Sequence, residues 1–182
     1  MSSAERTRED EFIQSIEQLD TGQLAMLRRG CGARDPVEGR CPWFFGLIRG
    51  VATEPTAFLV ASLLAQYKTS DIRSGRHRAE GNFGDTWKRA IAGTNSESIR
   101  RRFHILLDSD YDPRTGDGDL PYRLRQMVCY ASRKGVGTNW QNLLKHVRNW
   151  NSPDRWVQKE WARSFFSSQG SEDVNTSSDQ SK

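Results

Sequence analysis

The stretch Ser98-Ile-Arg-Arg-Arg-Phe-His-Ile-Leu-Leu107 indicates both a fold class and a candidate site. At about 100° per residue, four apolar side chains fall on one face of a helix, namely Ile99, Phe103, Leu106 and Leu107. This face must be buried against other helices, whereas Arg101 points away from it and Arg100 and Arg102 lie on its flanks. The planar guanidinium group suits phosphate, so the exposed side of this helix is a candidate nucleic-acid-binding surface. An ordinary solvated face is the alternative.

Similar helical periodicity recurs along the chain, and no segment alternates apolar and polar residues for long. Helices are expected over about residues 4–19, 21–30, 43–51, 55–67, 83–91, 98–107, 121–134, 139–147 and 153–165. The segment 55–67 is apolar around most of its circumference, which is typical of a central buried helix. The chain is therefore predicted to be all-α, with about eight or nine helices in two small packed helical lobes.

Glycine and polar residues at 93–95 mark the expected boundary between the lobes. We expect an N-terminal helical lobe over residues 1–94 and a C-terminal helical bundle lobe over residues 95–167. From 168 to 182 the composition turns to Ser, Gln, Asp and Asn, which predicts a disordered polar tail. Residues 68–82 are polar and rich in cations, which indicates a loop that an anion could order.

The net charge of +4 is distributed unevenly. Residues 1–20 carry 2 Arg against 6 acidic residues, and residues 168–182 carry 1 Lys against 3. Because the two ends contribute −4 and −2, the segment between them carries +10. A surplus of this size favours a polyanionic partner.

The sequence contains no constellation of residues typical of catalysis. The three histidines are far apart, and no nucleophile elbow, phosphate-binding loop or zinc-protease motif occurs. Cys31, Cys41 and Cys129 have no C-x-x-C spacing, which indicates neither a disulfide framework nor a zinc site. We therefore expect a protein that is not an enzyme and that uses no metal or cofactor.

The acidic segment 108–119 resembles an EF-hand calcium loop in the spacing of its first aspartates. It has Pro113 where such a loop needs glycine for a sharp turn, and Asp119 where it needs a long bidentate glutamate. We expect a solvated acidic loop here rather than a calcium site.

The longest mainly apolar run, residues 58–65, is too short to span a bilayer. The N-terminus has no apolar segment of the signal-peptide kind. These features predict a cytoplasmic protein.

Basic side chains recur on the expected outer faces of several helices. The candidates for binding a nucleic-acid backbone are Arg28, Arg29, Lys88, Arg89, Arg101, Arg102, Arg123, Arg125, Lys145 and Arg148. Each pair alone is typical of a solvated surface, but together with the +10 segment they favour phosphate binding. Interleaved tryptophans can stack on bases, although Trp87, Trp140 and Trp161 occupy expected core positions.

Five stretches in order resemble the CasB family, the small subunits of the type I-E CRISPR Cascade surveillance complex. The first, Leu19-Asp-Thr-Gly-Gln-Leu-Ala-Met-Leu-Arg-Arg-Gly30, is similar to the family pattern L-x-x-G-x-x-A-x-L-R-R. The others are residues 83–91, 101–107, 120–128 and 135–165, so the resemblance covers most of residues 12–166. The chain departs from the family at Asn139, where Asp is frequent, and in residues 113–119, which look like a local insertion.

The resemblance implies an all-helical, non-catalytic subunit that works with the other Cascade subunits and crRNA. Such proteins associate as a head-to-tail pair. They help to hold the crRNA–target hybrid and the displaced DNA strand through backbone contacts. Where the stretches match the family, the resemblance implies a phosphate-binding role for eight of the candidates. They are Arg28, Arg29, Lys88, Arg89, Arg101, Arg102, Arg123 and Arg125.

Two other functions are compatible with the residues. A helix-turn-helix regulator would read DNA bases, and the junction at 133–137 before Asn139-Trp-Gln-Asn142 is the nearest candidate for its turn and recognition helix. A helical protein–protein adaptor would use its arginines only for solubility.

Overall fold

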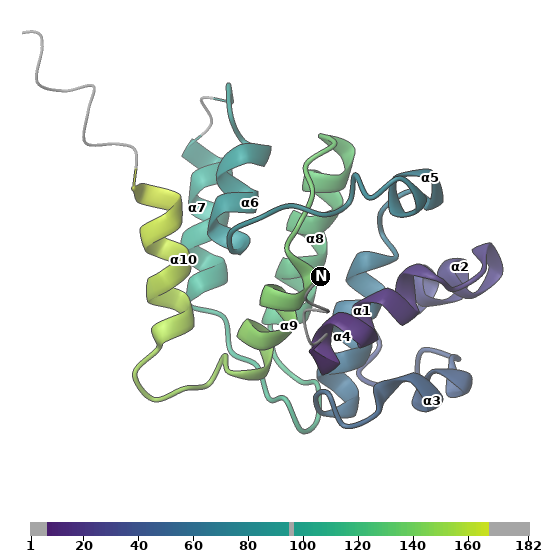
Figure 1. Cartoon of the computed structure of the whole chain (residues 1–182). Helices are drawn as coiled ribbons and strands as arrows, with labels where there is room; N and C mark the ends of the chain where they lie inside the picture. Colours follow the sequence, from purple (N-terminus) through teal and green to yellow (C-terminus); the bar gives the residue numbers. More distant parts are fainter. Residues whose placement is uncertain (1–6, 95–96, 168–182) are drawn as a thin grey trace, which may run out of the picture.

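The structure is a computed structural model that describes residues 7–94 and 97–167. The tail expected over residues 168–182 lies outside the described residues. Within them the chain forms ten α-helices, one short 3₁₀ helix and no strand, which confirms the all-α prediction (Figure 1). In chain order these are α1 (Arg8–Glu17), α2 (Thr21–Gly30), η1 (Pro42–Phe44), α3 (Phe45–Ile48), α4 (Glu54–Leu64), α5 (Thr69–Arg73), α6 (Phe83–Ala90), α7 (Glu97–Leu107), α8 (Leu120–Arg133), α9 (Trp140–Arg148) and α10 (Trp156–Phe166).

Local sequence explains where many of these helices begin. The helices α1, α2 and α6 each start at a capping box, with Thr7, Asp20 and Asn82 as the N-cap residues. In such a box the N-cap side chain and the third helical residue satisfy each other's backbone N–H groups. Pro55 and Pro121 lie in the first turns of α4 and α8, where a missing N–H has no cost.

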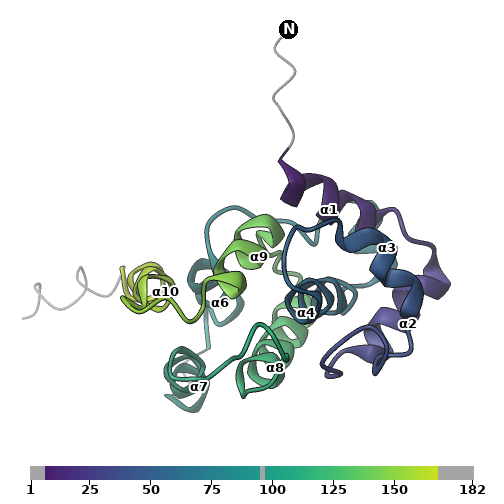
Figure 2. The same ribbon diagram turned by 90° about the horizontal axis from the view of Figure 1, so that it is seen from below.

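The helix α4 is the centre of the molecule, as its apolar composition predicts. Every residue from Pro55 to Leu64 is buried. It packs against α2, α8 and α9, and Figure 2 shows these helices around it.

Helices from the two expected lobes interleave in the packing. The helix α6, which precedes the expected boundary, packs against α10 and α8, whereas α9, which follows it, packs against α4 and α1. The buried apolar side chains form one continuous cluster. This cluster includes residues from both sides of residue 94. The division into two lobes at that residue stays a prediction.

The contact between α6 and α10 depends on Gly84. A Cβ atom at Gly84 would lie 2.2 Å from the carbonyl oxygen of Trp161, so only glycine allows the two backbones to approach this closely. The neighbouring Phe83 ring packs on the Trp161 ring at a centroid distance of 5.1 Å.

Two predictions from local sequence are wrong. The last helix begins at Trp156 rather than at residue 153, because Arg155 takes a left-handed conformation with φ of 52°. Residues 68–82 are not a free loop: they contain α5 and are held to α1. Glu17 accepts hydrogen bonds from His77 Nε2 at 2.8 Å and from Arg78 Nε at 2.6 Å, so these residues are already engaged within the fold.

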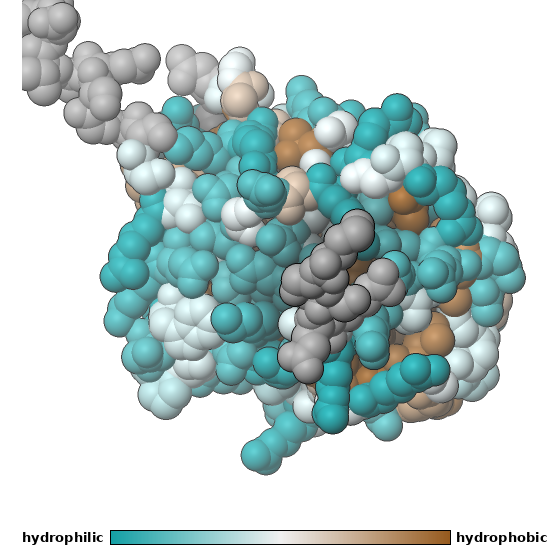
Figure 3. Space-filling view, in the orientation of Figure 1, coloured by the Kyte–Doolittle hydropathy of each residue, from teal (hydrophilic) through white to brown (hydrophobic). Residues whose placement is uncertain are grey.

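Among the described residues, no helix is both long enough and apolar enough to cross a membrane. The face seen in Figure 3 is hydrophilic over most of its area, with apolar side chains at the surface only in small separate areas.

Candidate nucleic-acid interface

The helix α8 presents arginines on both flanks of its exposed side. Residues two apart on an α-helix point roughly 200° apart, so Arg123 and Arg125 diverge on either side of α8. The inner side is fixed in the core by buried Leu124, Met127 and Val128. Figure 2 shows α8 between α7 and the segment that follows α2, along one edge of the molecule.

On the first flank, α8 faces α7. Arg102 of α7 and Arg123 of α8 line a small hollow together with Gln126 and the buried Trp87. Arg123 Nη2 donates to Asp119 Oδ2 at 2.8 Å, four residues earlier. On this flank the Arg123 guanidinium is therefore paired with Asp119, and the Arg102 guanidinium lines the same hollow.

The arginines of α7 are displayed on a helix whose opposite side is anchored. Phe103 is fully buried, and its ring packs on the Phe165 ring of α10 at a centroid distance of 4.4 Å. Arg101 and Arg102 are exposed, whereas Arg100 is half-buried. The periodicity of this stretch predicts this arrangement, and the structure confirms it.

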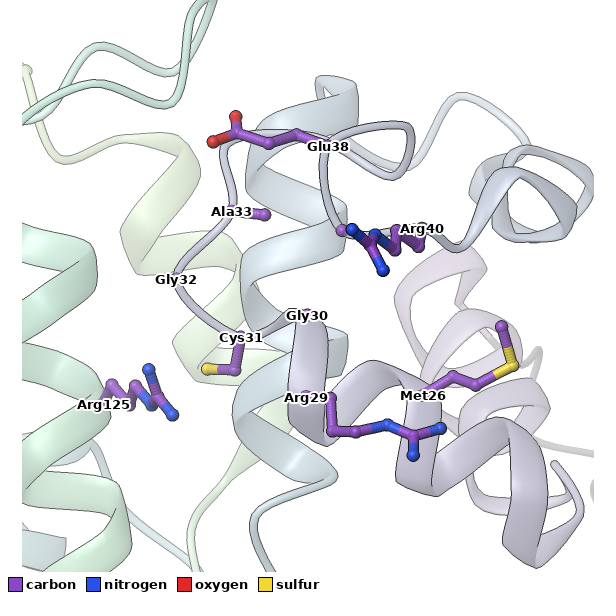
Figure 4. Close-up of a pocket in the computed structure, with 10 residues that line it drawn as sticks. Met26, Arg29, Gly30, Cys31, Gly32, Ala33, Glu38, Arg40 and Arg125 are labelled. Atoms are coloured by element: carbon purple, nitrogen blue, oxygen red, sulfur yellow. The ribbon is translucent and has the colours of Figure 1, made fainter.

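On the second flank, α8 faces the end of α2 and the loop that follows. Arg29, Arg40 and Arg125 line a cavity of about 740 Å³ (Figure 4). Figure 4 shows Arg125 extending from α8 toward Cys31, with Arg29 and Arg40 on the other side of the hollow. A Cβ atom at Gly32 would lie 3.3 Å from Arg125 Nη1, so the backbone turns closely around this guanidinium.

The acidic residue that lines this cavity, Glu38, is paired away from these arginines. Its carboxylate accepts a hydrogen bond from Arg34 Nε at 3.0 Å. The side-chain and backbone hydrogen bonds from Arg34 lower the pKa of Glu38 below its ordinary value. The positive charge of the cavity is thus left largely uncompensated.

We call the surface formed by these two flanks the basic face, which consists of Arg29, Arg40, Arg101, Arg102, Arg123 and Arg125. Within residues 7–94 and 97–167, every member except Arg123 lacks a hydrogen bond or ion pair. Arginines without a protein partner keep all their donors for an anion. Such a surface suits a chain of phosphates.

The remaining candidates from the sequence lie elsewhere or serve the fold. Arg28 points inward, and its Nε donates to the Ala65 carbonyl at 2.7 Å, at the C-terminal end of α4. Arg89 Nη2 donates to the Glu80 carbonyl at 2.9 Å, and Lys88 is half-buried.

The two candidates on α9 lie away from the basic face. Arg148 Nη1 lies 3.2 Å from Glu9 Oε1 and donates to the Val51 carbonyl at 3.0 Å. Lys145 Nζ lies 6.0 Å from the centre of the Trp156 ring. The helix α9 itself packs on α4 and α1, apart from the edge that α7 and α8 form in Figure 2.

Arg40 was not among the candidates, because it stands alone in a turn-rich segment and has no basic neighbour in sequence. Only folding of the 31–42 loop against α2 brings it beside Arg29. Arg40 has a positive φ of 57°, which is unusual for arginine. The sequence therefore does not predict the turn that places its side chain at the cavity.

The tryptophans do not provide a stacking surface. Trp87, Trp140 and Trp161 are buried as predicted, and Trp150 is also buried. Trp43 and Trp156 are half-buried against the core. The most exposed large aromatic side chain of the described residues is Tyr122 on α8, at 62%.

The carboxylates of the 108–119 loop are used within the protein. Asp119 pairs with Arg123, Asp117 with Arg34 at 3.4 Å, and Asp108 with Arg155 at 3.4 Å. No group of three or more His, Cys, Asp or Glu in the described part of the chain is arranged to hold a metal ion.

Comparison with known proteins gives a consistent result. The family profile described as CRISPR-associated protein Cse2 matches residues 23–166. A CRISPR-associated protein Cse2 from Thermus thermophilus is 34% identical over 116 residues, which cover 64% of this chain. The match spans 59% of that relative's length.

Solved structures agree with the profile. A crystal structure of M. ruber CasB matches with a TM-score of 0.69 and 30% identity, covering 90% of this chain and 94% of that one. A Cse2-family protein from Thermus thermophilus matches with a TM-score of 0.68 and 25% identity, over 92% and 99% of the two chains. A chain of a CRISPR RNA-guided surveillance complex shares the fold, with a TM-score of 0.69 at 21% identity over 87% and 91%. The chain belongs to the Cse2 family of CRISPR-associated proteins.

Proposed function

We propose that the chain is a non-catalytic small subunit of a crRNA-guided antiviral surveillance complex of the Cascade type. Its basic face binds nucleic-acid backbone without sequence specificity and stabilises the crRNA–target hybrid and the displaced DNA strand. The observation that carries this proposal is that five arginines beside α8 have no hydrogen bond or ion pair within the described part of the chain, namely Arg29, Arg40, Arg101, Arg102 and Arg125. Family membership and the shared fold of a chain from a surveillance complex support the setting.

The chemistry of the basic face suits backbone binding rather than base reading. Its groups are guanidiniums spread over α2, the following loop, α7 and α8. Contacts to phosphate position a protein on nucleic acid but carry no sequence information. The partners in this proposal are the other Cascade subunits, crRNA, the target and displaced DNA strands, and a second copy in a head-to-tail pair. The proposed place of action is the cytoplasm.

The geometry of α9 disfavours a helix-turn-helix regulator. Base reading needs free polar side chains at the start of a recognition helix. Here Asn139 caps α9 by accepting a hydrogen bond from Asn142 N at 3.0 Å. Asn142 Nδ2 donates to the Gly81 carbonyl at 3.2 Å, and Trp140 is fully buried. The start of α9 is thus engaged in packing.

A charge-reversal experiment in the assembled complex tests the proposal. The double variant Arg101→Glu, Arg102→Glu would be assembled with the other subunits and crRNA, and the affinity for target DNA measured at low and high salt. We expect the variant to be incorporated into the complex as the wild type is. Its DNA affinity should fall more than tenfold at low salt, because two exposed positive charges become negative.

The matched control reverses two exposed lysines that are not members of the basic face, with Lys145→Glu on α9 and Lys159→Glu on α10. This control should keep its affinity within about twofold. If the arginine variant binds DNA as the wild type does, the adaptor function is supported and the proposal fails.

A further inference from the structure

An exposed tyrosine lies on α8, the helix that carries arginines of both flanks of the basic face. Tyr122 is in the first turn of α8 and points roughly 200° away from the buried Leu124. Its side chain is 62% exposed, a large value for an aromatic ring. Gln126 Nε2 donates to the Tyr122 hydroxyl at 2.6 Å, which fixes the ring against one turn of the helix.

The position of Tyr122 relates it to both groups of arginines. Arg125 follows it by three residues, so the two side chains are neighbours on the helix surface, and Arg125 lines the cavity with Arg29 and Arg40. Gln126, which holds the ring, lines the other hollow with Arg102 and Arg123. A flat apolar ring therefore stands between two sets of cations.

This combination suits one class of ligand. An exposed ring next to guanidiniums matches a nucleic-acid strand whose bases are unpaired, because a free base can stack on the ring while its phosphates lie on the cations. Bases inside a duplex are stacked on each other and offer no free face to the ring. A phosphate could accept a hydrogen bond from the Tyr122 hydroxyl, but it offers nothing to the face of the ring.

We propose that the basic face takes a single strand, with one unpaired base stacked on Tyr122. The strand crosses α8, so that phosphates on one side of the stacked base lie on Arg125 and Arg29 and those on the other side lie on Arg102. This inference rests on the proposed function, because it assumes that the basic face binds backbone. It adds the kind of strand bound and a group that contacts a base.

The test compares Tyr122→Ala and Tyr122→Phe with the wild type, using the full chain and fluorescent oligonucleotides of one length. The probes are a base-bearing single strand, the same strand with abasic sugars, and a blunt duplex. We expect Tyr122→Ala to weaken binding of the base-bearing strand at least about 5-fold. Binding of the abasic strand and the duplex should stay the same, and Tyr122→Phe should behave as the wild type.

A second variant separates this inference from the proposed function. Arg125→Gln should weaken binding of all three probes and reduce the salt dependence, whereas Tyr122→Ala should leave the salt dependence unchanged. Deoxy and ribo versions of the single strand show which nucleic acid is preferred.

Each outcome decides a claim. If Arg125→Gln weakens binding and Tyr122→Ala changes nothing, the stacking inference is overturned and backbone binding stands. Equal losses on the base-bearing and abasic strands also overturn it. Absence of measurable binding by the full chain to any probe overturns the stacking inference, whereas the charge-reversal experiment in the assembled complex decides the proposed function.

Discussion

Replacing Phe103 by alanine tests whether α7 is anchored as the structure shows. The Phe103 side chain is fully buried and lies 4.4 Å from the Phe165 ring, between centroids. Phe-to-Ala changes in a core cost about 3–5 kcal/mol of unfolding free energy, because apolar burial is lost and a cavity is left. For a chain of this size each kcal/mol corresponds to about 2–4 °C, so the melting temperature should fall by about 6–20 °C.

The assay is thermal unfolding followed by circular dichroism, with urea unfolding to give the free energy. Ile105→Ala is the matched control on the same helix, since Ile105 is 38% exposed. It should cost about 1 kcal/mol or less. The account of α7 would be refuted by a Phe103→Ala protein as stable as the wild type, or by equal losses in the two variants.

Two further predictions concern other contacts. Gly84→Ala places a Cβ atom 2.2 Å from the Trp161 carbonyl oxygen, so α6 and α10 must separate. Urea unfolding should show a loss of about 1–3 kcal/mol in the free energy of unfolding. An unchanged urea midpoint would contradict this packing. Burial alone would raise the pKa of Glu17, but hydrogen bonds from His77 and Arg78 lower it below the ordinary 4.5. The wild type should therefore lose stability as the pH falls from about 4.5 through the lower folded-state pKa. Glu17→Gln should lose less over that range, and a parallel loss in both proteins would argue against the pairing.

Local periodicity was enough to predict most of the helices and their buried faces, although it missed α5. In α7 the apolar spacing placed Phe103 and Leu106 in the core, and both are fully buried. In α4 the apolar residues around the circumference predicted a central helix, and it is surrounded by others. These features follow from sequence because they depend on residues within one helix.

Contacts between distant segments could not be predicted in this way. Residues 68–82 carry cations that look free in sequence, yet Glu17, 61 positions before Arg78, accepts hydrogen bonds from it. The start of α10 was placed too early, because the sequence Ser152-Pro-Asp154 is typical of a helix start while the left-handed Arg155 delays it. Such pairings are set by tertiary packing.

The same reason limits the prediction of the candidate site. Arg28 and Arg29 are neighbours in sequence but point about 100° apart on α2. Arg28 therefore reaches the Ala65 carbonyl at the end of α4, whereas Arg29 lines the cavity with Arg125. A pair of basic residues in sequence gives two separate side chains whose roles depend on the elements around them.

The central claim is that the basic face binds phosphates, and the salt dependence of single-strand affinity tests it most directly. Contact with about five phosphates gives a slope of log K against log salt near −3.5. In the triple variant Arg101→Gln, Arg102→Gln, Arg125→Gln the slope should become shallower by about 2, whereas Lys145→Gln with Lys159→Gln should leave it unchanged. A triple variant with the wild-type slope and affinity would contradict the account.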